Sequence, residues 1–200
     1  MKFNPTVSLF LLFVVLVATS LTVRGQVLHY EIVKGGDVIG EMVAKKEISG
    51  KQMVYSISSV TNFRMLVKLR VDYNLTETYE GGVLKSGHAI STLNGAVQKE
   101  SKVERRANNY HIERGSDYVT YPAAEIRFSI PEIYFTEPVA QTKVFSQVFG
   151  DDLIIERLGN HQYQLDSEDG RNTYTYTRGV CSEVKVSRSY ATFYIRLKSD

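Results

Sequence analysis

Apolar and polar residues alternate one by one along residues 65–75 of this chain. The apolar positions are Met65, Val67, Leu69, Val71, Tyr73 and Leu75, and polar side chains separate them from Lys68 onward. Successive side chains of a β-strand point to opposite faces, so this period of two predicts a strand with one buried face and one wet face.

The alternation continues weakly through Thr76, Thr78 and Tyr79 to the glycine pair at 81–82. At about 3.3 Å per residue, these roughly fifteen residues would span about 50 Å, well beyond an ordinary strand. A strand of that length has to bend or carry a bulge, as strands do when they wrap around a barrel. The length therefore predicts a curved sheet.

Turn residues divide the rest of the chain into hairpin-sized pieces. The clearest signal is Asn94 followed by Gly95, because both central residues of a type I′ turn need a positive φ. Similar signals recur at 35–37, 49–51, 81–82, 108–109, 115–117, 159–160, 169–170 and 178–179. We therefore predict an all-β fold, a strongly curved antiparallel meander of about eleven strands that forms a barrel or half-barrel.

Residues 121–140 break this rhythm with three prolines, Pro122, Pro131 and Pro138. Proline cannot donate to a strand ladder, so we expect a short insert without strands, with a helical turn at 125–130. Its apolar residues 133–135 need burial. The insert is expected to be a crossover that plugs one open end of the sheet, or alternatively a lid or wall of a ligand cavity.

The first 25 residues differ from the rest. Lys2 precedes an almost unbroken apolar run at 7–17, and small residues follow it. This is the layout of a secretory signal peptide, with cleavage after Ser20 or after Gly25. A membrane anchor is the competing interpretation, but the run is shorter than the about 20 residues that span a bilayer. We expect residues 1–25 to be a signal peptide and residues 26–200 to be a single β domain, exported to the periplasm or beyond and not an integral membrane protein.

Removal of a signal peptide changes the charge balance. Without Lys2 and Arg24, the 24 basic residues fall to 22, which equals the 22 acidic residues. Nucleic-acid binding relies on many basic contacts to phosphate, so we expect no nucleic-acid partner. The oligomeric state is left open.

Motifs for catalysis or cofactor binding do not stand out. The histidines at 29, 88, 111 and 161 are scattered, and His111 with Glu113 is too small a set to hold a metal. Asp151 and Asp152 follow a glycine, where neighbouring carboxylates face water. The single cysteine, Cys181, is interpreted as a half-buried strand residue rather than a nucleophile. We expect no catalytic residue, no metal and no cofactor, and so not an enzyme.

Tyrosine is over-represented: the chain has 13 tyrosines and no tryptophan. The ordinary explanation is that tyrosine suits a half-buried pleated surface. The alternative is an aromatic-lined cavity for an apolar or amphiphilic ligand. The candidate lining residues come from the alternating strand and the insert: Met65, Val67, Leu69, Val71, Tyr73, Ile133, Tyr134 and Phe135.

Two segments have distinctive sequences, YFTEP at 134–138 and YTYTRGVC at 174–181. With YEIVK at 30–34 and LGNHQY at 158–163, they make the chain similar to a family of exported bacterial proteins of unknown function, found mainly in Bacteroidota. The resemblance implies export and a β architecture, and no reaction. The chain is also loosely similar to periplasmic half-barrels that carry lipoproteins, a likeness of architecture that does not fix function.

Three functions stay open. A binding protein for an apolar small molecule, lipid or lipid-modified partner would have an interior larger than its side chains fill, opening near residues 121–140. A cell-envelope interaction or structural module would have a filled core and an exposed edge or patch. A hydrolase-type enzyme, which we disfavour, would bring several polar residues together in a cleft.

Overall fold

The computed structural model describes residues 24–64, 68–122, 125–189 and 191–199 of the chain. The first eight strands are β1 (Arg24–Lys34), β2 (Asp37–Ser49), β3 (Gln52–Arg64), β4 (Lys68–Glu80), β5 (Val83–Leu93), β6 (Ala96–Arg106), β7 (Asn109–Arg114) and β8 (Asp117–Tyr121). A 3₁₀ helix, η1 (Ile130–Tyr134), separates them from β9 (Lys143–Ser146), β10 (Asp151–Gly159), β11 (Gln162–Ser167), β12 (Gly170–Thr177), β13 (Val180–Arg188) and β14 (Ala191–Leu197). The all-β prediction is confirmed.

The strand number predicted from the sequence was too low, because the sheet has 14 strands rather than about eleven. The shortest strands are β8 with 5 residues and β9 with 4. In β9, Val144, Phe145 and Ser146 are all buried, so this strand has no alternation of apolar and polar residues. A period of two cannot reveal a strand that is short and buried on both faces.

All strands pair antiparallel in a single sheet with the order β8-β7-β6-β5-β4-β3-β2-β1-β14-β13-β12-β11-β10-β9. Neighbours in space are therefore neighbours in sequence, with one exception. The first strand pairs with the last, from Tyr30 opposite Leu197 to Val33 opposite Tyr194. The meander thus runs outward from the middle of the sheet on one side and returns to the middle from the other.

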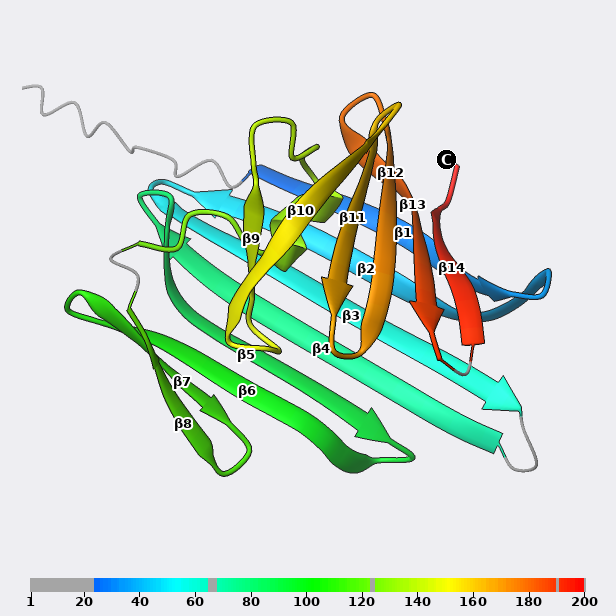
Figure 1. The fold of residues 1–200 in the computed structure, drawn as a ribbon, viewed down its shortest axis with the longest axis horizontal. Helices are drawn as coiled ribbons and strands as arrows, with labels where there is room; N and C mark the ends of the chain where they lie inside the picture. Colours follow the sequence, from blue (N-terminus) through cyan, green and yellow to red (C-terminus); the bar gives the residue numbers. More distant parts are fainter. Residues whose placement is uncertain (1–23, 65–67, 123–124, 190, 200) are drawn as a thin grey trace, which may run out of the picture.

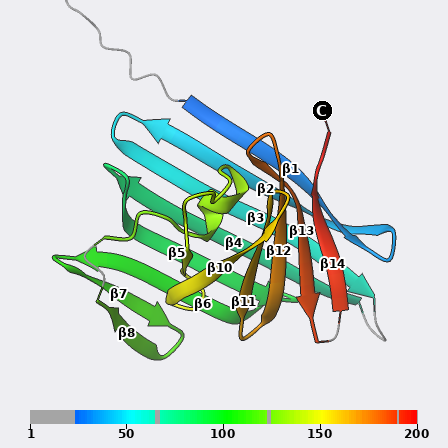
Figure 2. The same ribbon diagram turned by 45° about the horizontal axis from the view of Figure 1, so that its top comes forward.

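The sheet curls into two layers that face each other. In Figure 1 the long strands β2–β6 run diagonally, and β9–β14 cross them at a steep angle with η1 between the two layers. Figure 2 shows η1 over the concave face of β3–β5. The layers meet through aromatic rings, since Phe63 on β3 lies 6.3 Å from Phe193 on β14, between ring centroids. The result is a barrel-like shape, as the length of the alternating segment predicted.

Strand β4 carries the alternation that predicted the fold. Leu75 and Tyr79 on it are buried, and Lys68 and Arg70 are exposed, as expected. The alternation continues to Tyr79, but a charged residue, Glu77, occupies the buried face between Leu75 and Tyr79. Met65 and Val67, at the start of the predicted strand, lie outside the described residues.

Hairpin turns occur where glycine and asparagine predicted them. Asn94 and Gly95 have φ values of 50° and 83°, and Arg178 and Gly179 have values of 54° and 80°. Positive φ at both central residues is the type I′ geometry, whose twist matches that of the flanking strands.

The insert contains a helical turn, but at η1 rather than at 125–130. Pro131 stands in the first turn of η1, where its fixed φ suits a helix and its missing N–H is not needed. The residues before it are extended: the Ile126 carbonyl accepts from Leu84 N–H on β5, and the Phe128 carbonyl accepts from Phe145 N–H on β9. The insert is therefore hydrogen-bonded both to β5 in one layer and to β9 in the other.

The insert also plugs one end of the barrel, as predicted. Ile133, Tyr134 and Phe135 are buried there. The Tyr176 hydroxyl donates to the Ile133 carbonyl at 3.0 Å, and the Phe135 ring lies 5.6 Å from that of Tyr55. Packing and hydrogen bonds from both layers hold the plug in place.

Candidate functional site

A cavity of about 880 Å³ lies between the two layers. Ligand pockets in proteins span about 300–1,000 Å³, so this volume is sufficient for a small molecule. The wider layer lines it with Ile32, Met42, Ile57, Val71, Tyr73 and Ala89. The crossing layer adds Leu153, Leu165, Tyr174, Val186, Phe193 and Ile195.

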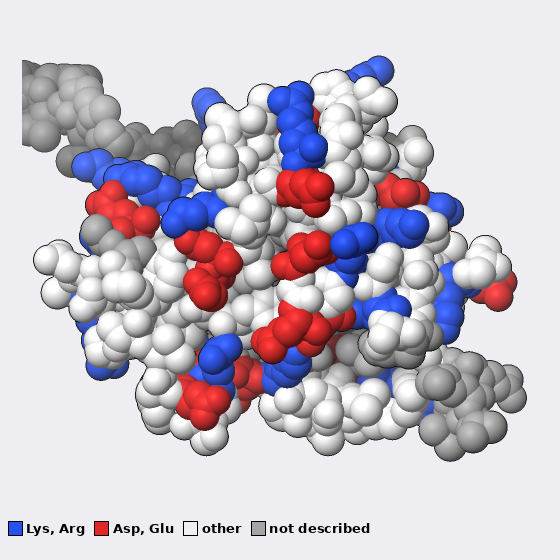
Figure 3. Space-filling model, in the orientation of Figure 1, with Lys and Arg blue, Asp and Glu red and all other residues white. Residues whose placement is uncertain are grey.

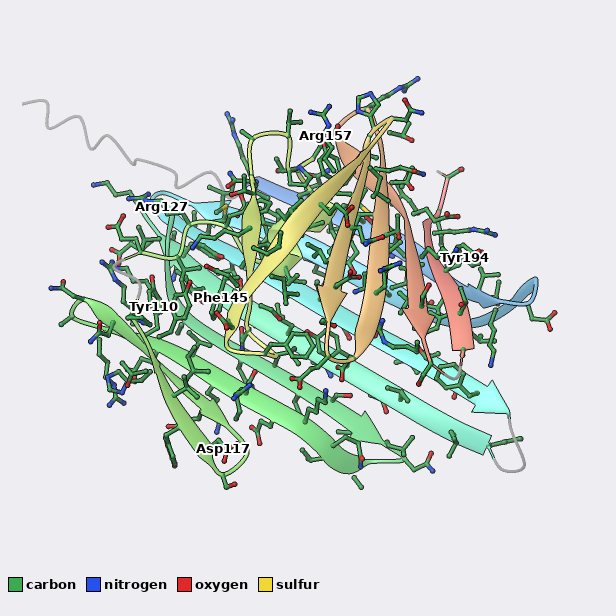
Figure 4. The ribbon with its side chains drawn as sticks, in the orientation of Figure 1. Tyr110, Asp117, Arg127, Phe145, Arg157 and Tyr194 are labelled. Atoms are coloured by element: carbon green, nitrogen blue, oxygen red, sulfur yellow. The ribbon has the colours of Figure 1, made fainter. Side chains whose placement is uncertain are left out.

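The cavity opens at the end of the barrel opposite the insert. Val97, Asp117, Phe149 and Asp169 belong to its lining, and they lie at the turns that follow the odd-numbered strands. In Figure 4, Asp117 marks this end at the tip of the β7–β8 turn, whereas Arg127 and Arg157 lie toward the opposite end.

The expected opening near residues 121–140 was therefore misplaced. Ile130 and Tyr134 of the insert form the inner end of the cavity instead of its mouth. The Tyr134 ring packs edge-on against Tyr30 at 5.6 Å and Tyr174 at 6.3 Å, between ring centroids. Aromatic burial draws this segment into the barrel, where it serves as both plug and inner wall.

The residues proposed as cavity lining are placed in three ways. Val71, Tyr73 and Tyr134 line the cavity. Leu69, Ile133 and Phe135 are not part of its lining: Leu69 is half-buried on β4, and the other two belong to the plug. Met65 and Val67 lie outside the described residues.

Sequence reasoning did not select Tyr174, which lines the cavity from β12. Its strand reads NTYTYT from 172, so Tyr174 and Tyr176 alternate with threonines, and both tyrosines are buried. That alternation was a usable signal for the inner face of the strand.

An ion pair bridges the mouth. Lys99 Nζ on β6 lies 2.7 Å from an Asp169 carboxylate oxygen in the β11–β12 turn, and 5.6 Å from the centre of the Phe149 ring. The two charged side chains keep 51% and 42% of their surface exposed. Exposed ion pairs contribute at most about 1 kcal/mol, so the contact across the mouth is weak.

Most buried tyrosines donate a hydrogen bond from the hydroxyl group to another part of the fold. The Tyr30 hydroxyl donates to the Cys181 carbonyl at 2.9 Å, and the Tyr110 hydroxyl donates to the Leu84 carbonyl at 3.1 Å. Each bond joins segments that are distant in the sequence, with an apolar ring buried alongside it. These tyrosines are fully buried rather than half-buried, and each combines a buried ring with a satisfied hydroxyl.

A buried carboxyl group lies close to the cavity wall. Glu77 is 0% exposed, and its Oε2 accepts hydrogen bonds from Ser129 and from Tyr79. Burial raises the pKa of Glu77 to about 7, although these hydrogen bonds oppose the rise. Among the described residues, Glu77 Oε1 and Gln147 Oε1 have no hydrogen-bond partner.

Gly87 makes room for this group. It stands opposite Glu77 on β5, and a Cβ added to it would lie 2.2 Å from Gln147 Oε1 and 3.2 Å from Glu77 Cγ. The Gln147 amide lies against the backbone there and donates to the Ser101 carbonyl at 3.2 Å. Ser101 in turn lines the cavity, so the polar group and the cavity share a wall.

Other candidate groups are placed differently from expectation. Asp151 and Asp152 begin β10 instead of forming a turn, and Asp152 accepts a hydrogen bond from the Tyr121 hydroxyl at 2.7 Å. His161 lies in the β10–β11 turn rather than in a strand, with Nδ1 2.9 Å from a Glu137 carboxylate oxygen. Cys181 is fully buried, not half-buried, and burial raises the pKa of its thiol.

No group of three or more His, Cys, Asp or Glu residues that could hold a metal ion occurs in residues 24–64, 68–122, 125–189 and 191–199. Over the same residues, no helix has the length and apolar character to cross a membrane. Basic and acidic side chains are interspersed on the face that Figure 3 shows, without a broad region of one sign.

Comparison with known proteins gives the family and the fold. No curated protein sequence matches the chain. A solved structure, described as a beta-barrel-like protein of domain of unknown function DUF1849 from Brucella abortus, is similar with a TM-score of 0.54 at 11% identity. The match covers 86% of this chain and 95% of that one, and it shows a shared beta-barrel-like fold. Residues 30–198 match the domain of unknown function DUF6134, and the chain therefore belongs to the DUF6134 family.

Proposed function

We propose that this protein is an exported binding protein that holds an apolar or lipid-like molecule inside its barrel. The observation that supports the proposal is the cavity of about 880 Å³ between the layers, lined on both sides by aliphatic and aromatic side chains. A module with a filled core would leave no such volume, because protein interiors are close-packed.

The position of the mouth favours a carrier role. The inner end is closed by Ile130 and Tyr134, and the outer end is crossed by the exposed ion pair of Lys99 and Asp169. Because such a pair is weak, a ligand can enter and leave without disruption of the core. The proposal includes no catalytic residue, no cofactor and no nucleic-acid partner.

Export is part of the proposal and rests on the amino-terminal sequence. Strand β1 begins at Arg24, which pairs with Ile48. Cleavage after Ser20 would leave the whole strand intact, whereas cleavage after Gly25 would remove its first two residues. Amino-terminal sequencing of the protein from its own cells distinguishes the two, and an uncleaved chain would contradict export by this route.

Ligand binding is tested with N-phenyl-1-naphthylamine, an uncharged probe whose fluorescence rises in apolar surroundings. Ser59 lines the cavity, and its neighbour Ser58 points outward and is exposed. Ser59→Phe should fill part of the cavity and weaken probe binding about tenfold or more, whereas Ser58→Phe should leave binding unchanged. Equal binding by both variants, or no binding by the parent protein, would contradict the proposal.

A further inference from the structure

Three phenol groups meet at the inner part of the cavity. Tyr73 comes from β4, Tyr134 from η1 and Tyr174 from β12, and all three side chains line the cavity. The rings of Tyr134 and Tyr174 are in edge-on contact at 6.3 Å between centroids. Tyr73 is close enough to both of them to interact electrostatically.

These phenols lack hydrogen-bond acceptors. No side-chain hydrogen bond joins the hydroxyl of Tyr73 or Tyr134 to another described residue, and the Tyr174 hydroxyl only accepts a long one, 3.4 Å, from the Asn172 amide. Buried tyrosine hydroxyls normally find a partner, as those of Tyr30 and Tyr110 do here. Three O–H donors in the cavity lining thus have no acceptor among the described residues.

The cations of the cavity lining, Lys99, Arg114 and Arg188, lie at the strand ends near the mouth, whereas a carboxyl group lies beside the phenols. Burial raises the pKa of Tyr174 to about 12 and those of Tyr73 and Tyr134 further, so all three remain donors at neutral pH. The buried carboxyl of Glu77 lies near Tyr73 and would repel an anion when it is ionised. Arg188 is the cation whose charge acts on Tyr174. Its guanidinium already donates a hydrogen bond to the Asn172 side-chain oxygen at 3.0 Å.

We infer that the cavity is built for an uncharged apolar molecule that carries a carbonyl or ester group, and that Tyr73, Tyr134 and Tyr174 supply the hydrogen-bond donors for its oxygen acceptors at the inner end. The inference rests on the proposed function and specifies its ligand class. The aliphatic part of the molecule would lie between Val71 and Phe193, which the strand register places nearer the mouth than Tyr73 and Tyr174. A ligand without an acceptor would leave the three donors unsatisfied, at a cost in affinity.

The test compares three competitors of equal chain length against N-phenyl-1-naphthylamine on the purified protein. These are decane, methyl octyl ketone and decanoate. One buried hydrogen bond corresponds to roughly tenfold in affinity, so the ketone should displace the probe at about one-tenth of the decane concentration. Decanoate should compete less well than the ketone, because its charge has to be buried near Glu77.

Substitution separates the phenols from the rest of the cavity. Tyr73→Phe and Tyr134→Phe should each weaken ketone binding roughly threefold to tenfold and leave decane and probe binding within about twofold. Tyr118→Phe is the matched control, since Tyr118 is 78% exposed on β8 and should not affect any ligand.

The outcomes distinguish the two proposals. Probe binding with equal affinity for ketone and decane, or with ketone affinity unchanged in both phenylalanine variants, would overturn the ligand class while the carrier role stands. A clear preference for decanoate would also overturn it, in favour of an anionic ligand. Failure of every probe to bind would overturn the carrier role itself, with water as the partner of the phenols.

Discussion

The substitution Glu77→Gln tests the consequence of a carboxyl group buried in the barrel wall. The Glu77 side chain is fully buried, and Ser129 and Tyr79 donate to one of its oxygens. Glutamine has the same shape, keeps an oxygen to accept these two bonds and cannot ionise. Its amide would stand where Glu77 Oε1 has no partner, close to the Gln147 side chain.

The magnitude follows from the two pKa values of this group. The carboxyl has a pKa of 4.5 as the reference for an unfolded chain and about 7 in the folded protein. Because the folded pKa is raised, the stabilisation is fully present below the unfolded pKa and is lost as pH rises through the folded pKa. Over the window from about pH 5 to about pH 8, the loss for this single group is about 2–3 kcal/mol.

The assay is urea unfolding followed by far-ultraviolet circular dichroism between these two pH values. The free energy of unfolding of Glu77→Gln, relative to the parent, should rise by about 2–3 kcal/mol from about pH 5 to about pH 8. Glu132, whose pKa is also raised to about 7, contributes to the rise for Glu77, so the same comparison in a Glu132→Gln background separates the two groups. Asp72→Asn is the control: the hydrogen bond from Arg70 lowers the pKa of Asp72, and both groups stay charged over this window, so their contribution should stay constant.

Parallel stability curves for the parent and Glu77→Gln would refute the reasoning. They would mean that the carboxyl is ionised in the folded barrel throughout the window, and that burial does not govern its titration.

Three further predictions concern the core. Gly40→Ala should destabilise the protein by about 2–3 kcal/mol in urea unfolding, because a Cβ there would lie 2.2 Å from the Val60 carbonyl oxygen; Gly35→Ala, at a turn with open space, should cost only about 1 kcal/mol. Tyr30→Phe should lower the free energy of unfolding by about 1–2 kcal/mol, since it removes the hydroxyl that bonds the Cys181 carbonyl, and an unchanged value would show that this bond contributes nothing. The Cys181 thiol should resist an aromatic disulfide reagent in the native protein and react once urea unfolds it, because it is fully buried and its pKa is raised; rapid native labelling would contradict its burial.

The parts of the fold that could be predicted from the sequence are those governed by local rules. The alternation on β4 and the positive φ values at Asn94 and Gly95 depend only on neighbouring residues, and both predictions are confirmed. Strand β9 was not predicted, because both of its faces are buried and it therefore shows no alternation. That burial results from packing against segments distant in the sequence. The site of η1 was missed by a few residues, since Pro131 favours the first turn of a helix rather than its end.

The cavity depended on contacts that sequence spacing does not encode. Val71 and Tyr73 were accessible to prediction because they share one face of β4. Tyr134 was predicted from its place in the apolar insert, whereas Tyr174 joins them because β12 belongs to the layer that crosses β4. The burial of Glu77 was not predicted, because a charged residue at an inward position departs from the alternation of apolar and polar residues. Space beside Gly87 and hydrogen bonds from Ser129 and Tyr79 accommodate its side chain.

The pairing of β1 with β14 has a consequence for biogenesis. A ribosome or translocation channel releases β1 long before β14, so the edge of β1 that faces Ile195 in the finished sheet stays without its partner until nearly the whole chain has emerged. Contacts between sequence-distant strands also form slowly. The β1–β14 pairing is therefore the last to form. A chain that lost β14 would keep an unpaired β1 edge, which favours aggregation or binding by a chaperone.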